Sequence, residues 1–421
     1  MISGVRVSLS AALLAAGGVA FAAAFVSASC RAPSERLTPA VAPAAAGQFV
    51  GSASCRECHQ DIYDRWKGTL MANVLQDVKA NPAAILADFS KPNPLVSFTR
   101  DDITHTYGSK WKQRYYKRIG NDFIVLPAQW DVQNRQWRPY YVKAGTDWWT
   151  AFYPPEQERR PTGALCDGCH SVNYDIATKT VTDWNVGCER CHGAGGAHLA
   201  EPIDGNIVNP AKLDHVRADD VCIQCHSQGK PRRLPIEGVY YDWPVGYQPG
   251  DLLADVWQFE EHHLGKETFT HWPDGTAHKN RMQGNDYVHS LMYVKGVTCY
   301  GCHDVHGTEH EADLRLPGNA VCTQCHTSAL QPGPPGSLEH HTRHKPESEG
   351  SRCVACHMPA IEQTIGDVMV RSHTFRFVSP ARTETDGMPN PCTSCHKDKT
   401  NEWALDELRR WPSTSPWRVS N

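Results

Sequence analysis

The longest hydrophobic segment of the chain lies at its N-terminus. Residues 9–26 are apolar and rich in alanine and glycine, they follow the single positive charge of Arg6, and the small residues 27–29 come next. This order of a charged, an apolar and a small-residue region is typical of a secretory signal peptide. We therefore predict that residues 1–29 direct export, although the apolar run is also long enough to remain as a membrane anchor.

Alternation of hydrophobic and polar residues is clearest between residues 91 and 161, where three short segments are separated by glycine and asparagine. This pattern predicts a small β-rich insertion whose tryptophans pack a sheet or form a partner surface. Residues 401–410 have instead the spacing of a short amphipathic helix. The predicted strands are Phe123–Leu126, Gln129–Val132 and Trp137–Val142, and the tryptophans are Trp111, Trp130, Trp137, Trp148 and Trp149.

The pentapeptide Cys-x-x-Cys-His occurs eight times and contains 16 of the 17 cysteines. One Cys-x-x-Cys could belong to a zinc site, a redox dithiol or a disulfide loop, but here every copy ends in histidine. The pentapeptide is the attachment signature of a c-type haem, with two thioether-forming cysteines and an axial histidine. We predict eight covalent haems c, attached by Cys55, Cys58, Cys166, Cys169, Cys188, Cys191, Cys222, Cys225, Cys299, Cys302, Cys322, Cys325, Cys353, Cys356, Cys392 and Cys395, with the axial histidines His59, His170, His192, His226, His303, His326, His357 and His396.

These cofactors change the expectation for the fold. Hydrophobic residues make up only 40% of the chain, which also has 29 prolines and 32 glycines. That is a small supply for a conventional core of this length, so the haems should complete it. We expect a mainly α fold with low regular structure, in which short helices and loops surround stacked haems and one small β-rich insertion is added. Without haem the chain should not fold.

Histidines outside the motifs are numerous, at 14 of the 22. Haem iron needs a second axial ligand unless that position stays open for chemistry. The surplus therefore predicts bis-histidine ligation of most haems, which favours low potentials and electron transfer.

Several segments resemble the multihaem cytochromes c related to the tetrahaem nitrification cytochrome. Residues 51–66 resemble the start of such proteins, and four later segments resemble their paired-haem regions; the likeness covers nearly the whole mature chain. It is specific for a multihaem cytochrome c and says little about a particular reaction. The later segments are 188–198, 296–306, 344–346 with 353–359, and 372–376, and the resemblance implies His198, His306, His344 and His373 as distal ligands.

For the remaining distal positions we favour His262, His271, His278 and His341, whereas His105, His215 and His310 are expected to be surface or structural residues. Many relatives carry a histidine shortly after the tryptophan of the first haem segment, where this chain has Met71. Three interpretations are open for haem 1: Met71 binds the iron, a distant histidine binds it, or the site is open. A packing role for Met71 is an equal alternative.

Motif spacing suggests how the chain is divided. The first motif stands alone, and two triplets beginning at Cys166 and Cys299 have nearly equal internal steps, which suggests a duplicated module. We predict a segment 48–165 with haem 1 and the β-rich insertion, a three-haem segment 166–298 with a histidine-rich loop, and a four-haem segment 299–421. Residues 30–47 form a linker behind Cys30, a cysteine placed like the lipidated residue of bacterial lipoproteins.

The formal net charge of -4 and the absence of a basic run give no indication of nucleic-acid binding. The motifs predict an octahaem electron carrier between redox proteins of the periplasm or cell surface, held at a membrane by a lipid on Cys30. The alternatives are an octahaem oxidoreductase for a small nitrogen or sulfur compound at one open haem, and a subunit of a haem filament. The altered haem motif that often marks such an enzyme does not occur in this sequence.

Overall fold

The computed structural model describes residues 47–140, 161–233, 235–236, 238–326 and 338–411. The predicted signal peptide, Cys30 and most of the linker lie outside these residues. So do Trp148, Trp149 and the last residues of the predicted strand 137–142.

A six-stranded antiparallel sheet is the largest regular element of the described chain. Its strands run in the order β1-β2-β3-β5-β6, with β4 paired to the other end of β3. The turn 120–121 joins β3 to β4, and Gly120 has the positive φ of 62° that such a turn requires. The strands are β1 (Leu75–Asp77), β2 (His105–Tyr107), β3 (Lys112–Ile119), β4 (Asp122–Val125), β5 (Ala128–Asp131) and β6 (Gln136–Pro139).

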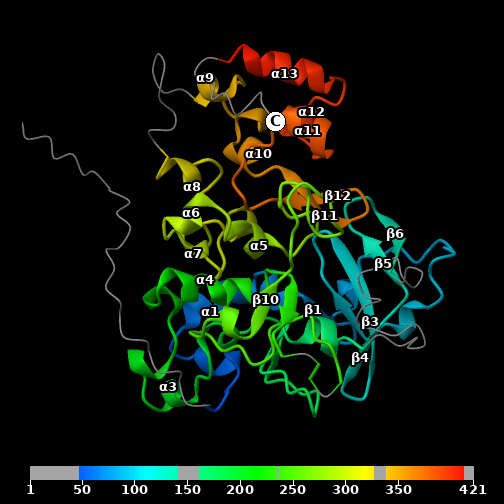
Figure 1. The fold of residues 1–421 in the computed structure, drawn as a ribbon. Coiled ribbons are helices and arrows are strands. Elements are labelled where there is room, and N and C mark those ends of the chain that lie inside the picture. Colours follow the sequence, from blue (N-terminus) through cyan, green and yellow to red (C-terminus); the bar gives the residue numbers. More distant parts are fainter. Residues whose placement is uncertain (1–46, 141–160, 234, 237, 327–337, 412–421) are drawn as a thin grey trace, which may run out of the picture.

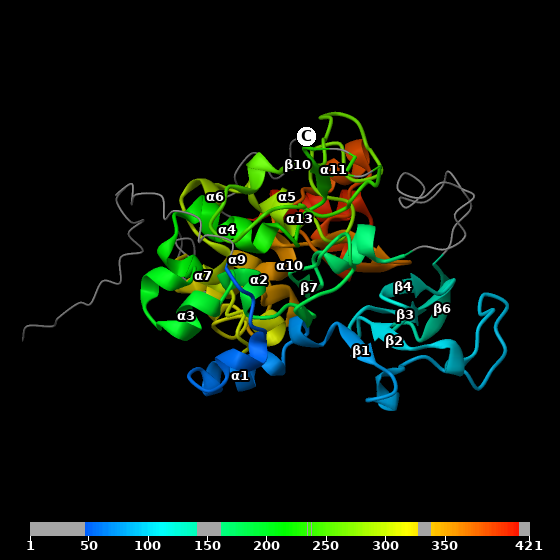
Figure 2. The ribbon, with the colours of Figure 1, turned by 90° about the horizontal axis from the view of Figure 1, so that it is seen from below.

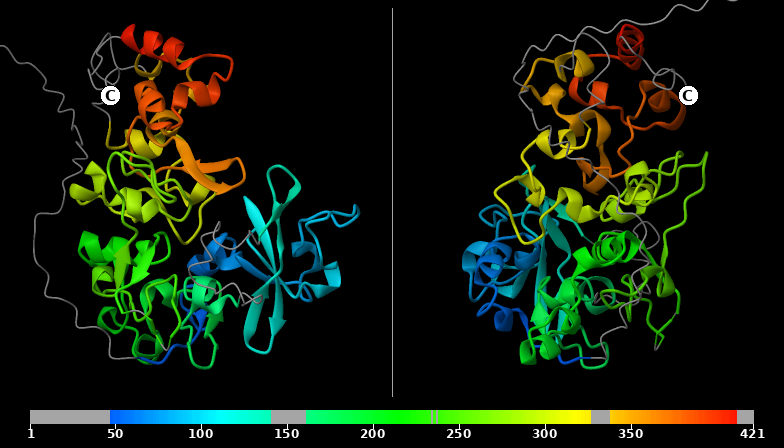
Figure 3. Two further views of the ribbon diagram at one scale, coloured as in Figure 1. Left: turned by 45° about the vertical axis from the view of Figure 1, so that its right-hand side comes forward. Right: turned by 90° about the vertical axis from the view of Figure 1, so that its left-hand side faces the viewer.

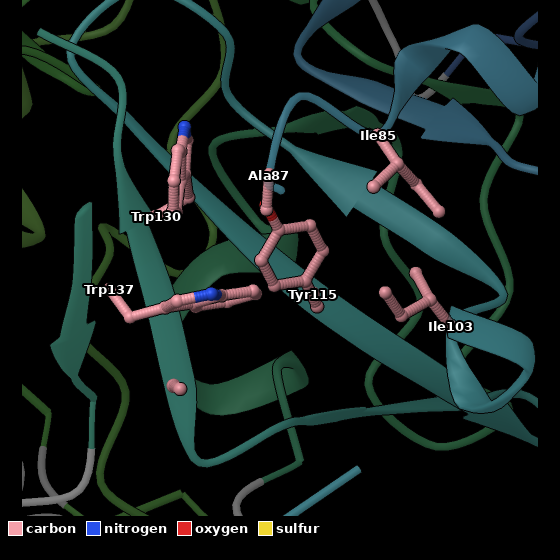
Figure 4. Close-up of a cluster of buried hydrophobic side chains, with 7 residues drawn as sticks. Ile85, Ala87, Ile103, Tyr115, Trp130 and Trp137 are labelled. Carbon is pink, nitrogen blue, oxygen red and sulfur yellow. The ribbon is translucent and has the colours of Figure 1, made fainter. Parts of the chain in front are cut away.

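The two faces of this sheet bury different partners. On one face Tyr115, Trp130 and Trp137 pack against the segment 78–104; the two tryptophan rings meet edge to face and the Tyr115 ring is tilted against Trp137 (Figure 4). The other face carries Tyr116 and Phe123, which pack with Trp184 from a distant part of the chain. Alternate residues of β3 therefore serve two separate cores, as the period of a strand requires.

The expectation of a mainly α fold is wrong. Helix accounts for 32% and strand for 17% of the residues. Three two-stranded ladders occur in regions expected to be loops: β7 (Ser171–Val172) with β8 (Asp183–Trp184), β9 (Gly229–Pro231) with β10 (Trp257–Phe259), and β11 (Ala360–Ile365) with β12 (Val368–Arg371). The turn Gly366-Asp367 between β-branched runs was a readable signal for the last hairpin.

Most helices are short and lie at the Cys-x-x-Cys-His motifs. Side chains begin several of them: Asp214 accepts hydrogen bonds from the amides of Val216 and Arg217 at the start of α4, and Asn390 caps α12 in the same way. The helices are α1 (Gln60–Lys67), α2 (Glu189–His192), α3 (Gly196–Ala200), α4 (His215–Ile223), α5 (Gln283–Tyr287), α6 (Leu291–Val294), α7 (Cys299–Cys302), α8 (Ala320–Thr323), α9 (Leu338–Thr342), α10 (Cys353–His357), α11 (Pro380–Asp386), α12 (Pro391–Cys395) and α13 (Asn401–Arg409).

The predicted helix at 401–410 is confirmed as α13, which buries Ala404, Leu405 and Leu408. Within the described ranges, none of the helices has the length and apolar character needed to span a bilayer.

The motif-bearing elements form an elongated body with the large sheet at its side. In Figure 1, α1 and α3 lie at one end of this body and α11–α13 at the other. Figure 2 shows the sheet standing beside the helices, and Figure 3 shows the β11–β12 hairpin reaching towards it. Lys112 of β3 donates a hydrogen bond of 2.8 Å to the Thr364 carbonyl, which holds the hairpin to the sheet. The division of the chain at residues 165 and 298 stays a prediction.

Candidate haem-binding sites

Each motif folds into one turn with its two thiols on the same side. The amide of the motif histidine donates to the carbonyl of the first cysteine, for example from His59 to Cys55 at 3.0 Å and from His170 to Cys166 at 3.1 Å. Residues three apart on such a turn are neighbours. This geometry lets both sulfur atoms of a motif reach one macrocycle while the histidine points to its centre.

Four motif histidines face a second histidine across a gap. Three of these ring pairs are nearly parallel, with interplanar angles of 11° to 19°, and the fourth is tilted by 31°. The pairs and their centroid distances are His59–His198 at 6.4 Å, His192–His306 at 6.2 Å, His357–His341 at 6.2 Å and His396–His344 at 6.0 Å.

These distances fit a bis-histidine haem. With a metal–nitrogen bond of about 2.0 Å and roughly 1.1 Å from ring centre to nitrogen on each side, two axial imidazoles would lie about 6.2 Å apart. The space between the paired rings has this width. The spacing of these four ring pairs therefore matches the spacing that bis-histidine coordination of an iron would need.

Hydrogen bonds orient the distal rings. Nδ1 of His198 lies 3.1 Å from the Ile203 carbonyl, and Nδ1 of His344 lies 2.6 Å from the Thr342 carbonyl. A carbonyl can only accept, so Nδ1 carries the proton and Nε2 is left to bind metal. His306 is held through Nδ1 by Asp304 at 3.1 Å.

His373 lies beside two further motifs. Burial lowers its pKa to about 4, and the charges of His303 and His226 contribute to the shift. Its Nδ1 lies 3.1 Å from the Arg371 carbonyl, so its Nε2 is also available to a metal. The structure thus places His373 near the histidines of motifs 5 and 4.

The other predicted distal ligands lie elsewhere. His262, His271 and His278 gather in the loop before α5, together with His289. The His262 ring is 5.4 Å from that of His271 and 5.3 Å from that of His289, and His278 packs on Trp272 at 4.2 Å. In the described part of the chain, no group of three or more His, Cys, Asp or Glu side chains is arranged so that it could hold a metal ion. The structure does not bring these three residues to a motif histidine.

Haem site 1 has a histidine opposite its motif. His198 faces His59. Met71 lies instead in a 3-10 turn (Met71–Asn73), and the Met71 carbonyl accepts a hydrogen bond from the amide of Val186. Of the three interpretations for haem 1, the geometry favours a distant histidine.

Haem site 2 differs from the four paired sites. Among the described residues, which include all 22 histidines, no histidine ring stacks on His170; the Tyr107 ring meets it edge-on instead, with centroids 4.8 Å apart and the planes at 77°. Burial lowers the pKa of His170 to about 3, and the charges of Arg281, His226 and Arg114 add to the shift. Sequence reasoning missed Tyr107 and its neighbours on β3, although the alternation Lys112-x-Arg114-x-Tyr116 was a readable signal.

Thiols of different motifs lie near one another in a continuous series. Side-chain hydrogen bonds join Cys55 to Cys188, Cys169 to Cys225, Cys222 to Cys299 and Cys322 to Cys353. Electrostatic interactions link Cys191 to Cys222, Cys302 to Cys322, and Cys356 to Cys392. Motifs 1, 3, 4, 5, 6, 7 and 8 therefore follow one another in space, and motif 2 branches from motif 4.

Comparison with known families agrees with the motif chemistry. Residues 292–331 match the family described as the doubled CXXCH motif, and residues 54–103 match the family described as cytochrome c554 and c-prime.

Two curated proteins are similar over part of the chain. The multiheme cytochrome MtrA of Shewanella baltica (strain OS185) is 26% identical over 153 residues, which is 34% of this chain and 43% of that protein. A probable tetraheme c-type cytochrome of Nitrosomonas europaea (strain ATCC 19718 / CIP 103999 / KCTC 2705 / NBRC 14298) is 26% identical over 148 residues, which is 35% of this chain and 58% of that protein. The chain thus matches about half of the length of each.

Among solved structures, the crystal structure of the outer cell wall cytochrome OcwA has a similar fold. The TM-score is 0.69 at 24% identity, and 86% of each chain is covered. Together with the motifs, these matches show that the chain is a multihaem c-type cytochrome with covalently bound haem.

Proposed function

We propose that this chain is an octahaem electron-transfer protein. The observation that carries the proposal is the unbroken succession of motif thiols from Cys55 to Cys392. Macrocycles attached to adjoining motifs have edges close together, which is what electron transfer from haem to haem requires. The bound haems supply the redox chemistry, while the chain fixes their spacing, ligation and burial.

Histidine ligation supports the same conclusion. The facing pairs, such as His59–His198 and His192–His306, would saturate the iron and favour low-potential electron transfer over ligand chemistry. We propose His341 and His344 as the distal ligands of motifs 7 and 8, and His373 as a distal ligand of motif 5 or 4.

The two ends of the succession suit exchange with other redox proteins. Cys58 of motif 1 and Cys395 of motif 8 are exposed, and these motifs lie at opposite ends of the body (Figure 1). A donor at one end and an acceptor at the other would use the whole chain of haems. We further propose that the protein is exported and lipid-anchored through Cys30 at the periplasmic or cell-surface side of a membrane.

Two measurements on the exported protein test the proposal. Its intact mass should equal the mature polypeptide plus eight haems, and a diacylated N-terminus at Cys30 should account for any further mass. Adsorbed on an electrode, it should exchange electrons reversibly over a broad low-potential range. Fewer than eight haems, or a redox response from only a fraction of them, contradicts an octahaem conductor; an unmodified start beyond Cys30 contradicts the anchor alone.

A further inference from the structure

The histidine that faces motif 3 donates a hydrogen bond to a carboxylate. His306 lies opposite His192, and its Nδ1 is 3.1 Å from Oδ1 of Asp304. A carboxylate can only accept, so Nδ1 carries the proton and Nε2 is left for a metal. The same oxygen also accepts from the amide of His306 at 3.1 Å. Two hydrogen bonds therefore hold the carboxylate of Asp304 in a fixed position beside the imidazole.

Other histidines at the haem sites have an uncharged partner at the corresponding nitrogen. Nδ1 of His198, of His344 and of His373 each lies within 3.1 Å of a main-chain carbonyl. On the other side of the motif 3 site, Nδ1 of His192 also lies 2.8 Å from a carbonyl. The partner of His306 differs from these by a full negative charge.

The carboxylate of Asp304 also joins this turn to motif 1. Arg65 lies in α1, the helix that follows motif 1, and its Nη1 is 3.3 Å from Oδ2 of Asp304 and 2.8 Å from the Gly307 carbonyl. Gly307 has a φ of 97°, and a Cβ there would come within 2.7 Å of the Arg65 carbonyl. Glycine thus allows the turn 304–307 to lie directly on α1. One oxygen of Asp304 serves His306 and the other serves Arg65.

A charged acceptor makes an imidazole a stronger ligand. A hydrogen bond to an ionised acceptor is about twice as strong as one to a neutral carbonyl. The Nδ1 proton of His306 is drawn towards Asp304, which makes Nε2 more basic. A more basic ligand stabilises ferric iron more than ferrous iron, so the reduction potential falls. Arg65 acts in the opposite sense, because its positive charge offsets part of the negative charge on Asp304.

We propose that Asp304 lowers the reduction potential of the haem at motif 3 through its hydrogen bond to His306, and that Arg65 limits this effect. Asp304 is a positioning residue, because it acts on the haem through the ligand. The inference rests on the proposed function, in which His192 and His306 bind that iron. Motif 3 stands between motifs 1 and 4 in the succession of thiols, so Asp304 would set the height of one step on the electron path.

Redox titration of the exported, fully haem-loaded protein measures the effect. Asp304→Asn keeps the size of the side chain and an oxygen acceptor but removes the charge. At a fixed applied potential it should raise the reduced-to-oxidised ratio of one haem about tenfold, which corresponds to about 59 mV for one electron. Asp304→Asn should affect the same haem whose potential rises in His306→Met.

Arg65→Gln tests the same relationship from the other side. The glutamine keeps an amide donor for the Gly307 carbonyl but leaves the charge of Asp304 without its counter-charge. The potential of the haem at motif 3 should therefore fall in Arg65→Gln, opposite to its rise in Asp304→Asn. If the two residues only held the turn in place, both variants would loosen it and shift the potential in the same direction. Shifts of the same sign overturn the proposal.

Asp313→Asn is the matched control. Asp313 lies in the same loop, but its carboxylate faces the amide of Thr308 at 3.4 Å rather than an imidazole. Its φ of 54° is one that asparagine also adopts, so the substitution removes a charge without straining the backbone. The ratio should change less than twofold in this variant. A shift as large as that of Asp304→Asn would show a general effect of charge and overturn the proposal.

The double variant separates the hydrogen bond from the field of the carboxylate. Methionine has no ring N–H, so Asp304→Asn should have no further effect on the potential when it is added to His306→Met. A tenfold effect that persists in that background overturns the proposal, because the charge would then act through space.

The same titrations separate this inference from the proposed function. If His306→Met raises the potential of one haem while Asp304→Asn changes none, the role of Asp304 is refuted and the proposed ligation stands. If His306→Met changes no potential, His306 is not a ligand, and the proposed ligation of motif 3 fails together with this inference. Reversible reduction of all haems of the wild type on an electrode tests the conducting function independently of both.

Discussion

The imidazole rings of His59 and His198 lie 6.4 Å apart and within 18° of parallel, although His59 belongs to motif 1 and His198 to the segment after motif 3. His198 follows directly after the third motif, whose thiol Cys188 touches Cys55 of the first. In the proposed ligation, the same segment would bring a second haem to haem 1 and provide the opposite face of its iron site.

Replacement of His198 by methionine should raise the midpoint potential of one haem. A thioether stabilises ferrous iron more than a second imidazole does, and axial ligands control haem potentials over a wide range, so the shift should be on the order of 100 mV. Redox titration of the exported protein measures it. The control is Met71→Leu, which should leave the midpoint potential of every haem unchanged. If Met71→Leu changes the potential of one haem and His198→Met changes none, the ligand is Met71.

Truncation of Trp137 should loosen the large sheet. Its ring lies in the cluster with Tyr115 and Trp130, only 8% exposed (Figure 4). Trp137→Ala leaves a cavity and should cost about 3–5 kcal/mol of local stability. Hydrogen exchange of the β5 and β6 amides measures this loss. Trp111→Ala is the comparison, because Trp111 is 37% exposed and its loss should cost less than about 1 kcal/mol; equal effects would contradict the burial assigned to Trp137.

The contribution of Asp286 to stability should fall as the pH rises from about 4 towards neutral. Burial raises the pKa of Asp286 to about 6, and its carboxylate accepts from Ser372 and from the amide of His373. The folded protein therefore holds this proton more tightly than the unfolded chain does. The stabilisation is complete below the unfolded pKa and is lost as the pH passes the folded pKa.

The size of this effect should be about 3 kcal/mol, since each pKa unit corresponds to roughly 1.4 kcal/mol. Asp286→Asn should remove this contribution and so change the slope of the unfolding midpoint against pH between 4 and 7. Glu362, a neighbouring buried carboxyl whose pKa is also raised, contributes in the same direction. A slope that Asp286→Asn leaves unchanged would show that Asp286 is ionised in the folded protein.

The protein-only core of the sheet narrows the expectation that the chain does not fold without haem: removal of haem should unfold the helical body while sparing part of the sheet. The largest purely protein cluster of the described residues surrounds Tyr115, and the clusters that contain motif cysteines, at Leu165 and at Trp243, are smaller. Haem is therefore needed to complete the apolar contacts around the motifs. Circular dichroism of the chain made without haem attachment should show strand but little helix; a native helical signal would refute the dependence on haem.

The haem motifs can be predicted from the sequence, but the histidines that face them cannot, because the two are positioned in different ways. A haem motif is local, so its cysteines and histidine can be located from spacing alone. A distal ligand is brought from elsewhere by packing: His341 and His344 face motif histidines, while His262, His271 and His278 come together in a loop of their own. Counting surplus histidines could not separate these groups.

The strand content was underestimated for a related reason. Strands as short as those of the β7–β8 ladder have no readable period and form only because a partner segment lies alongside. The β3 strand did have a period, but Lys112 and Arg114 on its inner face resemble solvent-facing residues in the sequence. Only the structure shows that this face is turned towards His170.

The central claim is that the haems form one continuous path, and interrupting the path at motif 5 tests it most directly. Cys222 touches Cys299, and Cys302 interacts with Cys322, so motif 5 is the link between motifs 1–4 and motifs 6–8. In the variant Cys299→Ser with Cys302→Ser, rapid-mixing reduction through one end should leave the haems of the other end oxidised for much longer than in the wild type. Equal reduction rates for all remaining haems would contradict a single continuous path.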